Sequence, residues 1–145
     1  MTPSPRREPL PEAPASHLVP VGEQITGFEE PDIIYMKLVG TVTEDEVRVI
    51  NEMQIDFCRG RDRVFFLIDL AELESLSNSS RRAAIEGLNQ MPVGGLAVFK
   101  APLTARVLAK LLVTGMRLFG KYLPLQFFDD EASARAWIEQ QRAAA

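Results

Sequence analysis

Residues 64–80 read "VFFLIDLAELESLSNSS", and this stretch decides the fold. Its first seven residues are apolar except Asp69, without the alternation of apolar and polar side chains that a half-exposed strand shows. A short run of this kind is typical of a central strand covered on both faces, as in parallel sheets. The polar residues at 77–80 have the composition of a helix start, and Pro92 marks the end of that helix. The stretch therefore predicts one strand–helix unit of an α/β protein.

The same alternation of strand and helix extends in both directions along the chain. Thr43 and Glu46 have the spacing of a capping box, which predicts the start of an earlier helix. Strands that are separated by helices require crossover connections, so the sheet should be mixed but mainly parallel, in the order ββαβαβαβα. The predicted elements are strands at 22–28, 32–40, 64–70, 94–100 and 123–128, and helices at 43–58, 78–90, 103–121 and 129–141.

Length and composition set the number of domains. The chain has 145 residues, of which 46% are hydrophobic and 25% charged, as in an ordinary globular domain. Six of the ten prolines fall within the first 20 residues, where there is little apolar material to bury. We therefore predict a disordered, proline-rich arm at 1–20 and one folded domain at 21–145.

Charge and cysteine content exclude several classes of protein. The net charge of −4 gives no basis for nucleic-acid binding, and the single cysteine, Cys58, cannot form an internal disulfide. No segment has the ~18 uninterrupted apolar residues of a membrane span, and the N-terminus lacks the apolar core of a signal peptide. These features favour a cytoplasmic protein.

The residues needed for common kinds of catalysis are missing. The only histidine, His17, lies in the proline-rich arm, so neither a Ser–His pair nor a histidine metal site can be assembled. The acids at 129–131 are explained by the start of the last helix, because acidic side chains suit its positive end. We expect no enzymatic activity, no metal and no cofactor.

The order of elements and four local stretches resemble the STAS superfamily, whose name joins sulphate transporters and anti-sigma-factor antagonists. Within it, the chain is most similar to the SpoIIAA-like branch of small bacterial proteins, which are often compared with SEC14-type lipid-binding folds. The resemblance covers roughly residues 23–141 and implies a STAS fold, a regulatory protein partner or a lipid-like ligand. The four stretches are "GTVTEDEV" at 40–47, "FLIDLAELESLSNSS" at 66–80, "GGLAVF" at 94–99 and "FFDDEASARAWI" at 127–138.

The resemblance also implies a phosphorylation site. In sigma-antagonist members, a strand that ends in Asp-Leu is followed by an Asp-Ser-Ser-Gly-Leu turn, and a partner kinase phosphorylates the second serine. Counted from Asp69 without a gap, that acceptor falls on Ser79. The surrounding motif differs at four positions, namely Ser77, Asn78, Ser80 and Arg81 in place of Asp, Ser, Gly and Leu.

The polar cluster itself is open to three interpretations. The first is simple capping, in which Ser77 or Asn78 accepts a hydrogen bond from the first turn of the helix. The second is a docking surface for an unidentified protein partner. The third is phosphorylation of Ser79, where the helix dipole and nearby arginines would stabilise the phosphate. The docking surface would comprise Ser77, Asn78, Ser79, Ser80, Arg81 and Arg82.

The predicted helix at 103–121 is the second candidate site. At ~100° per residue, a basic stripe occupies an arc of about 60°, and apolar residues span about 180° of the opposite side. So wide an apolar face can cover the core and a neighbouring helix, or it can form a homodimer interface, bind an apolar ligand or contact a membrane surface. The basic stripe is Arg106, Lys110, Arg117 and Lys121, and the candidate ligand or dimer surface is Leu108, Leu112, Met116 and Phe119.

Two functional hypotheses follow. The preferred one is a non-enzymatic regulatory module that docks onto a protein partner through the cluster at 77–82. The alternative is a binder of a small apolar or lipid-like molecule in a pocket under the helix at 103–121. A solid core under that helix would favour docking, and a pocket there would favour ligand capture.

Overall fold

The structure, a computed structural model, describes residues 17–144. It contains one six-stranded sheet with the strands in sequence order, β1-β2-β3-β4-β5-β6. The first two strand pairs are antiparallel, and β3 to β6 are parallel to one another. The mixed, mainly parallel α/β fold predicted from the sequence is therefore confirmed. The strands are β1 His17–Val21, β2 Gln24–Glu29, β3 Ile33–Val42, β4 Val64–Leu76, β5 Val93–Phe99 and β6 Leu125–Phe128, and the helices are α1 Glu44–Phe57, α2 Asn78–Asn89, α3 Leu103–Arg117 and α4 Glu131–Ala143.

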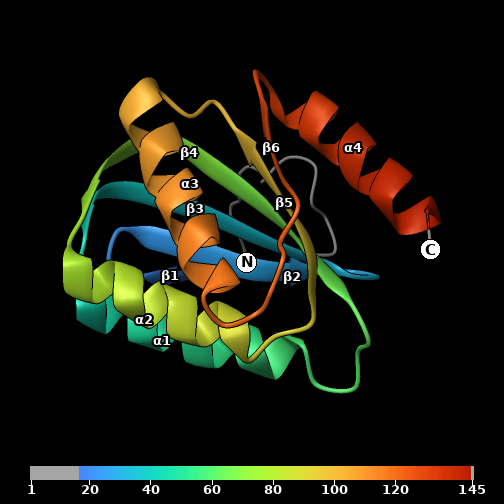
Figure 1. Ribbon diagram of the computed structural model, residues 1–145, viewed down its shortest axis with the longest axis horizontal. Coiled ribbons are helices and arrows are strands. Elements are labelled where there is room, and N and C mark those ends of the chain that lie inside the picture. The colour runs from blue at the N-terminus through green and yellow to red at the C-terminus, as the bar shows by residue number, and fades with distance from the viewer. Residues whose placement is uncertain (1–16, 145) are drawn as a thin grey trace, which may run out of the picture.

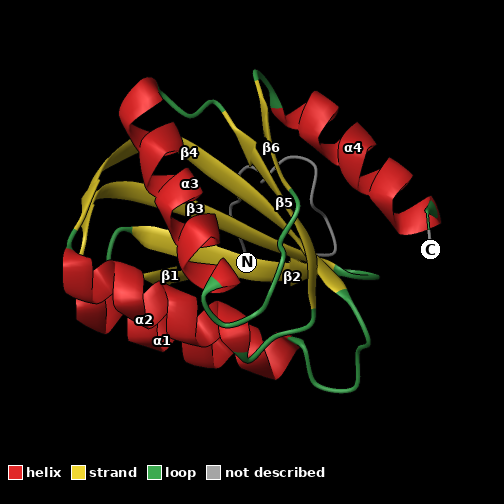
Figure 2. Cartoon of the chain, viewed as in Figure 1, coloured by secondary structure: helices red, strands yellow, loops and turns green. Residues whose placement is uncertain are grey.

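The helices divide unequally between the two faces of the sheet. α1, α2 and α3 cover one face, where Phe66 and Val98 point into the larger core cluster. α4 lies on the opposite face, over Phe65 and Ala97. Figure 1 shows α1 and α2 side by side, α3 crossing in front of the sheet, and α4 apart from the other three. The yellow sheet of Figure 2 is thus covered on both faces around β4, β5 and β6.

The first strand corrects the predicted boundary of the N-terminal arm. The sequence placed residues up to Pro20 in the arm, but His17–Val21 pairs with β2, with Pro20 opposite Ile25. A proline is tolerated there because β1 is an edge strand, whose outer side needs no backbone donor. The rest of the predicted arm, residues 1–16, lies outside the described residues.

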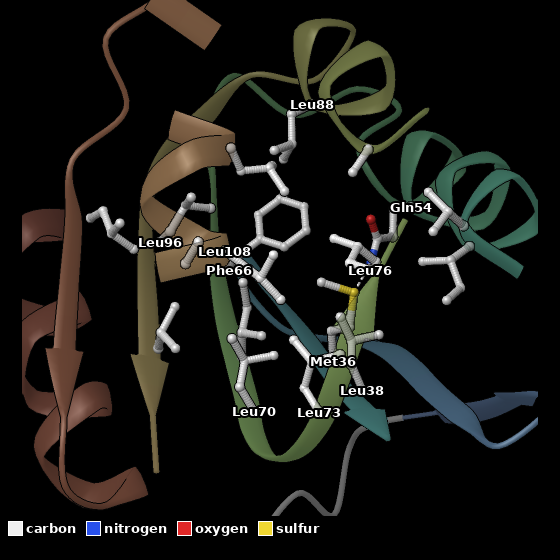
Figure 3. A pocket seen from close by; sticks show the side chains of 18 of the residues that line it. Met36, Leu38, Gln54, Phe66, Leu70, Leu73, Leu76, Leu88, Leu96 and Leu108 are labelled. Carbon is white, nitrogen blue, oxygen red and sulfur yellow. Dashed lines mark hydrogen bonds between the residues drawn. The ribbon is translucent and has the colours of Figure 1, made fainter. Parts of the chain in front are cut away.

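The fourth strand is longer than predicted. It does not end at Leu70 but runs on through "AELESL" to Leu76. Beyond Asp69 it pairs only with β3, and two irregularities shift the register along this part of the ladder. This extension curves, as Figure 3 shows, and brings Leu70 and Leu73 over the space beneath the helices.

Local hydrogen bonds explain where the helices begin. The capping box of α1 is confirmed, because the Glu46 amide donates to Thr43 Oγ1 at 3.1 Å and the Thr43 amide donates to Glu46 Oε1 at 3.0 Å. α4 begins after Asp130, whose carboxylate accepts from the Ser133 amide at 2.8 Å. This bond lowers the pKa of Asp130.

Among the helices within residues 17–144, none combines the length and apolarity that crossing a bilayer requires.

Candidate functional site

An apolar cavity of about 100 Å³ lies between the sheet and the three helices on its larger-core side. Five strands and helices supply most of its lining: the side chains come from β3, α1, β4, α2 and α3, with further contributions from β5 and β6. Figure 3 shows Phe66 near the centre of the lining, between Leu88 and the curved end of β4. The apolar lining is Met36, Leu38, Val47, Ile50, Phe66, Ile68, Leu70, Leu73, Leu76, Ala84, Leu88, Leu96, Val98, Leu108, Ala109, Leu112 and Leu125.

The cavity contains almost no polar chemistry. Asn51 and Gln54, both on α1, are the two polar residues in its lining, and no charged side chain takes part. Asn51 Nδ2 donates to the Ala83 carbonyl at 2.9 Å, which ties α1 to α2. Gln54 is 3% exposed. Such a lining can bind an apolar molecule, but it offers no acid, base or nucleophile.

The structure divides the predicted ligand surface on α3. Leu108 and Leu112 are half-buried and line the cavity. Met116 is fully buried, packs in the core and is not part of the lining. Phe119 lies beyond the end of α3 and is 59% exposed, so it cannot line a pocket under this helix. Half of the predicted set therefore belongs to the cavity.

The end of α3 explains this division. The helix ends at Arg117, and Gly120 adopts a φ of +76° in the following turn. The Lys121 amide then donates to the Met116 carbonyl at 3.2 Å, which is the pattern of a glycine-terminated helix. Residues 118–121 thus leave the helix, although the sequence placed them on it.

The predicted basic stripe is only partly a surface. Lys121 Nζ donates to the Leu88, Asn89 and Met91 carbonyls at 3.3, 3.2 and 2.9 Å, so it satisfies the C-terminal end of α2. Arg106 is half-buried and donates to the Ala101 carbonyl at 3.1 Å. Lys110 and Arg117 are exposed and remain on the outer side of α3.

The outer face of α3 also carries exposed apolar side chains. Leu103, Val107 and Leu111 recur every four residues and are 76%, 50% and 47% exposed. This is a different set from the ligand or dimer surface that the sequence suggested. The homodimer stays a prediction, which light scattering tests.

The three serines of the polar cluster have three different environments. Ser77 is the N-cap of α2 and accepts from the Ser80 amide at 3.1 Å, which confirms the capping interpretation. Ser80 is fully buried and donates to the Val42 carbonyl at 3.0 Å, so its side chain is not available to a partner. Ser79 is half-buried, with its hydroxyl 3.1 Å from that of Ser77.

The remaining residues of the cluster form a basic edge next to the start of α1. Asn78 and Arg82 are exposed, whereas Arg81 donates to Asn78 Oδ1. Glu44 of α1 lies close by: its pKa is lowered chiefly by the hydrogen bond from Arg48, and also by Ser79 and Arg82. A phosphate on Ser79 would therefore meet an arginine and a carboxylate together.

Asp69 is the last residue of β4 that pairs with β5, and it lies outside the cavity. One of its carboxylate oxygens accepts from the Ala71 amide at 3.0 Å, which braces the strand where it leaves β5.

Cys58 is buried at the end of α1. Within residues 17–144, His, Cys, Asp and Glu form no group of three that could hold a metal ion.

Comparison with known proteins identifies the class. A family model described as SpoIIAA-like matches residues 33–139. The chain therefore belongs to the SpoIIAA-like family, and with it to the STAS superfamily that the sequence resembles.

A solved structure shows the same fold. It is an uncharacterized protein of the DUF3478 family with a SpoIIAA-like fold from Shewanella loihica PV-4. The two chains share 17% identity with a TM-score of 0.57 over 84% of this chain and 90% of the other. At this identity the similarity concerns the fold alone. A comparison with curated proteins gave no match.

Proposed function

We propose that this protein is a non-enzymatic binding domain that holds a small apolar molecule in the cavity beneath α3. The observation that carries the proposal is the cavity itself, about 100 Å³ in volume and lined by apolar side chains. Keeping such a space within a well-packed domain costs about 2 kcal/mol at roughly 24 cal/mol per Å³. A ligand bound in this space would offset part of that cost.

The volume limits the size of the ligand. An engineered apolar cavity of about 150 Å³ takes up benzene. The cavity here is smaller, so we restrict the proposal to a small ring or a short chain, and not a whole lipid. Since the lining offers no acid, base or nucleophile, it supports binding and not bond chemistry.

The test is direct observation of an apolar probe in the cavity. Toluene should shift the NMR signals of the Leu108 and Leu112 methyl groups, which line the cavity, and leave those of Ile138, on the α4 face, unchanged. Ala109→Leu, which adds carbons to the lining, should weaken this binding. Uniform small shifts across both faces would contradict the proposal.

A second candidate function is regulatory docking at the start of α2, which agrees with membership of the STAS superfamily. The observation that favours it is that the first turn of α2 has no acidic residue and is followed at once by Arg81 and Arg82. Positive charge at a helix N-terminus opposes the helix dipole, by about 0.3–1 kcal/mol per residue. An acidic partner, or a phosphate on Ser79, would relieve this unfavourable arrangement.

Protein purified from its source without denaturation tests this second function. We expect a phosphate on the peptide that contains Ser79, and a partner whose binding changes in Ser79→Asp. Ser80→Asp is not a suitable comparison, because Ser80 is buried. Arg82→Ala removes an exposed charge from the same edge and should also change the binding of an acidic partner. Binding that is unchanged in both variants would argue against docking here.

A further inference from the structure

The cavity contains one buried polar atom without a partner, the side-chain oxygen of Gln54. Gln54 lies on α1, is 3% exposed and lines the cavity. Its Nε2 donates to Thr26 Oγ1 at 3.1 Å and approaches Met36 Sδ at 3.4 Å. Within residues 17–144, no group donates to its Oε1. Figure 3 shows this amide among the apolar side chains, with the oxygen turned away from Met36.

The hydrogen bonds around Thr26 fix the orientation of this amide. The Thr26 hydroxyl donates its single proton to the Tyr35 carbonyl at 2.9 Å. Thr26 Oγ1 can therefore only accept from Gln54, so the NH₂ group must face Thr26 and the oxygen must face the other way. With the Thr26 proton directed at the Tyr35 carbonyl, a rotated amide would place two acceptors, the Gln54 oxygen and Thr26 Oγ1, against each other. The free acceptor thus depends on the hydrogen bond from Thr26 to Tyr35.

A second buried amide nearby shows what complete pairing looks like. Gln24 is 1% exposed, and its Nε2 donates to the Val39 carbonyl at 3.0 Å while its Oε1 accepts from the Val39 amide at 2.7 Å. Both halves of Gln24 are satisfied by one backbone residue. Most buried polar groups are paired in this way, and leaving one unpaired carries a free-energy cost. Gln54 departs from the rule at the one buried amide that faces the cavity.

From this contrast we infer that the ligand of the cavity is an uncharged apolar molecule with a single hydrogen-bond donor, a small phenol or alcohol, whose hydroxyl donates to Gln54 Oε1. The inference rests on the proposed function and specifies its ligand. A carboxylate is excluded as the buried group, since it would meet the Gln54 oxygen and no cation lines the cavity. A lone water is a poor substitute, because ordered buried waters usually have two to four polar partners. Asn51, the other polar lining residue, is only half-buried, so solvent can reach it.

Phenol and toluene provide the test, because they differ only in a hydroxyl in place of a methyl group. Calorimetric titration of the full chain gives the affinity of each probe for the wild-type protein and for Gln54→Leu. We expect the ratio of phenol to toluene affinity to fall about tenfold in Gln54→Leu, which corresponds to loss of one buried hydrogen bond. Ile50→Val, at a neighbouring lining position of α1, should leave the ratio unchanged.

A measurement on the wild-type protein does not depend on whether the variant folds. The ¹³C signal of the Gln54 side-chain carbonyl should move clearly further on addition of phenol than on addition of toluene. This inference is overturned if the affinity ratio is the same in the wild type and Gln54→Leu, or if the Gln54 carbonyl signal moves no further with phenol than with toluene. Either result leaves the proposed function standing. Binding of neither probe to the wild type overturns both.

Discussion

At the scale of single residues, the polar cluster shows how neighbouring serines separate into different roles. Ser77 caps α2, Ser80 is buried against the Val42 carbonyl, and Ser79 faces the edge near Glu44. The sequence predicted a cap and left its identity open between Ser77 and Asn78. It could not separate Ser79 from Ser80, because one helical step of about 100° turns a side chain from solvent to core.

We predict that Ser80→Ala lowers the free energy of unfolding by about 1–3 kcal/mol, because it leaves the buried Val42 carbonyl without its donor. Ser77→Ala should cost about 1 kcal/mol through loss of the cap. Ser79→Ala, the matched control, should stay within about 0.5 kcal/mol. Urea denaturation of the three variants measures the order. A larger loss in Ser79→Ala than in Ser80→Ala would contradict these assignments.

Tyr35 gives a prediction about pH. The pKa of Tyr35 is raised to about 12, chiefly by burial and also by the charges of Asp69 and Glu131, while Arg135 acts in the opposite direction. An unfolded tyrosine has a pKa of about 10. The folded state therefore holds its proton more tightly, so this contribution to stability is complete below pH 10 and is lost as pH rises through 12.

Comparison with Tyr35→Phe isolates this contribution, because lysine deprotonation affects both proteins alike. We expect the wild type to lose more of its unfolding free energy than Tyr35→Phe does between about pH 9 and pH 11.5. Chemical denaturation at both pH values measures the difference. Parallel losses in the two proteins would show that Tyr35 titrates in the same way folded and unfolded.

Gln54 marks a limit of prediction at this scale. Apolar residues at helical spacing define the inner face of α1, and a glutamine does not add to that apolar pattern. Gln54 nevertheless lies seven residues after Val47 and four after Ile50, both buried, which places it on the same face of α1. A polar residue in phase with an apolar stripe is the signal that could have indicated it. The free oxygen could not be predicted, because it depends on where Thr26 donates.

At the scale of elements, most helices and strands were predictable, but β1 and the end of β4 were not. In its second half, the buried residues Leu70, Leu73 and Leu76 recur every three positions. Neither the period of 2 of a strand nor the period of 3.6 of a helix fits this spacing. Irregular pairing with β3 causes it, since an extra residue in a strand shifts which side chains face the core. This same extension supplies part of the cavity wall. Because the predicted strand ended at Leu70, the sequence did not indicate that Leu73 and Leu76 line the cavity.

The contact between Lys121 and the end of α2 supports a prediction at this scale. Three carbonyls of the segment 88–91 accept from its ammonium group. Lys121→Ala removes these charge-assisted bonds and should lower the unfolding free energy by about 1–2 kcal/mol. Lys110→Ala removes the same charge from an exposed position on α3 and should have almost no effect. Thermal unfolding of the pair measures this; equal effects would mean that only overall charge matters.

At the scale of the whole molecule, the order of elements was predictable and the interior volume was not. Apolar runs and turn residues report on one segment at a time, and their order is enough to define a mixed sheet with crossover helices. A cavity depends on the distances among seven elements, so it is a property of no single segment. The sequence did indicate α3 as one wall of a possible pocket, because this helix is more apolar than a surface helix requires. It could not show that only Leu108 and Leu112 of the predicted set face that space.

Filling the cavity tests the balance between stability and binding for the whole molecule. Ala109 lines the cavity and is half-buried, so Ala109→Leu should place three more carbons into it. Recovering part of the roughly 2 kcal/mol that the cavity costs should raise the unfolding free energy by about 1 kcal/mol, and the midpoint of thermal unfolding by about 2–4 °C. The control is Ala136→Leu, at an exposed position of α4. A gain in stability together with loss of toluene binding, seen only in Ala109→Leu, would mean that the empty cavity lowers the unfolding free energy and that toluene binds in this same space. Destabilisation by Ala109→Leu with no change in the control would mean that the interior cannot accept the added carbons, and it would contradict this prediction.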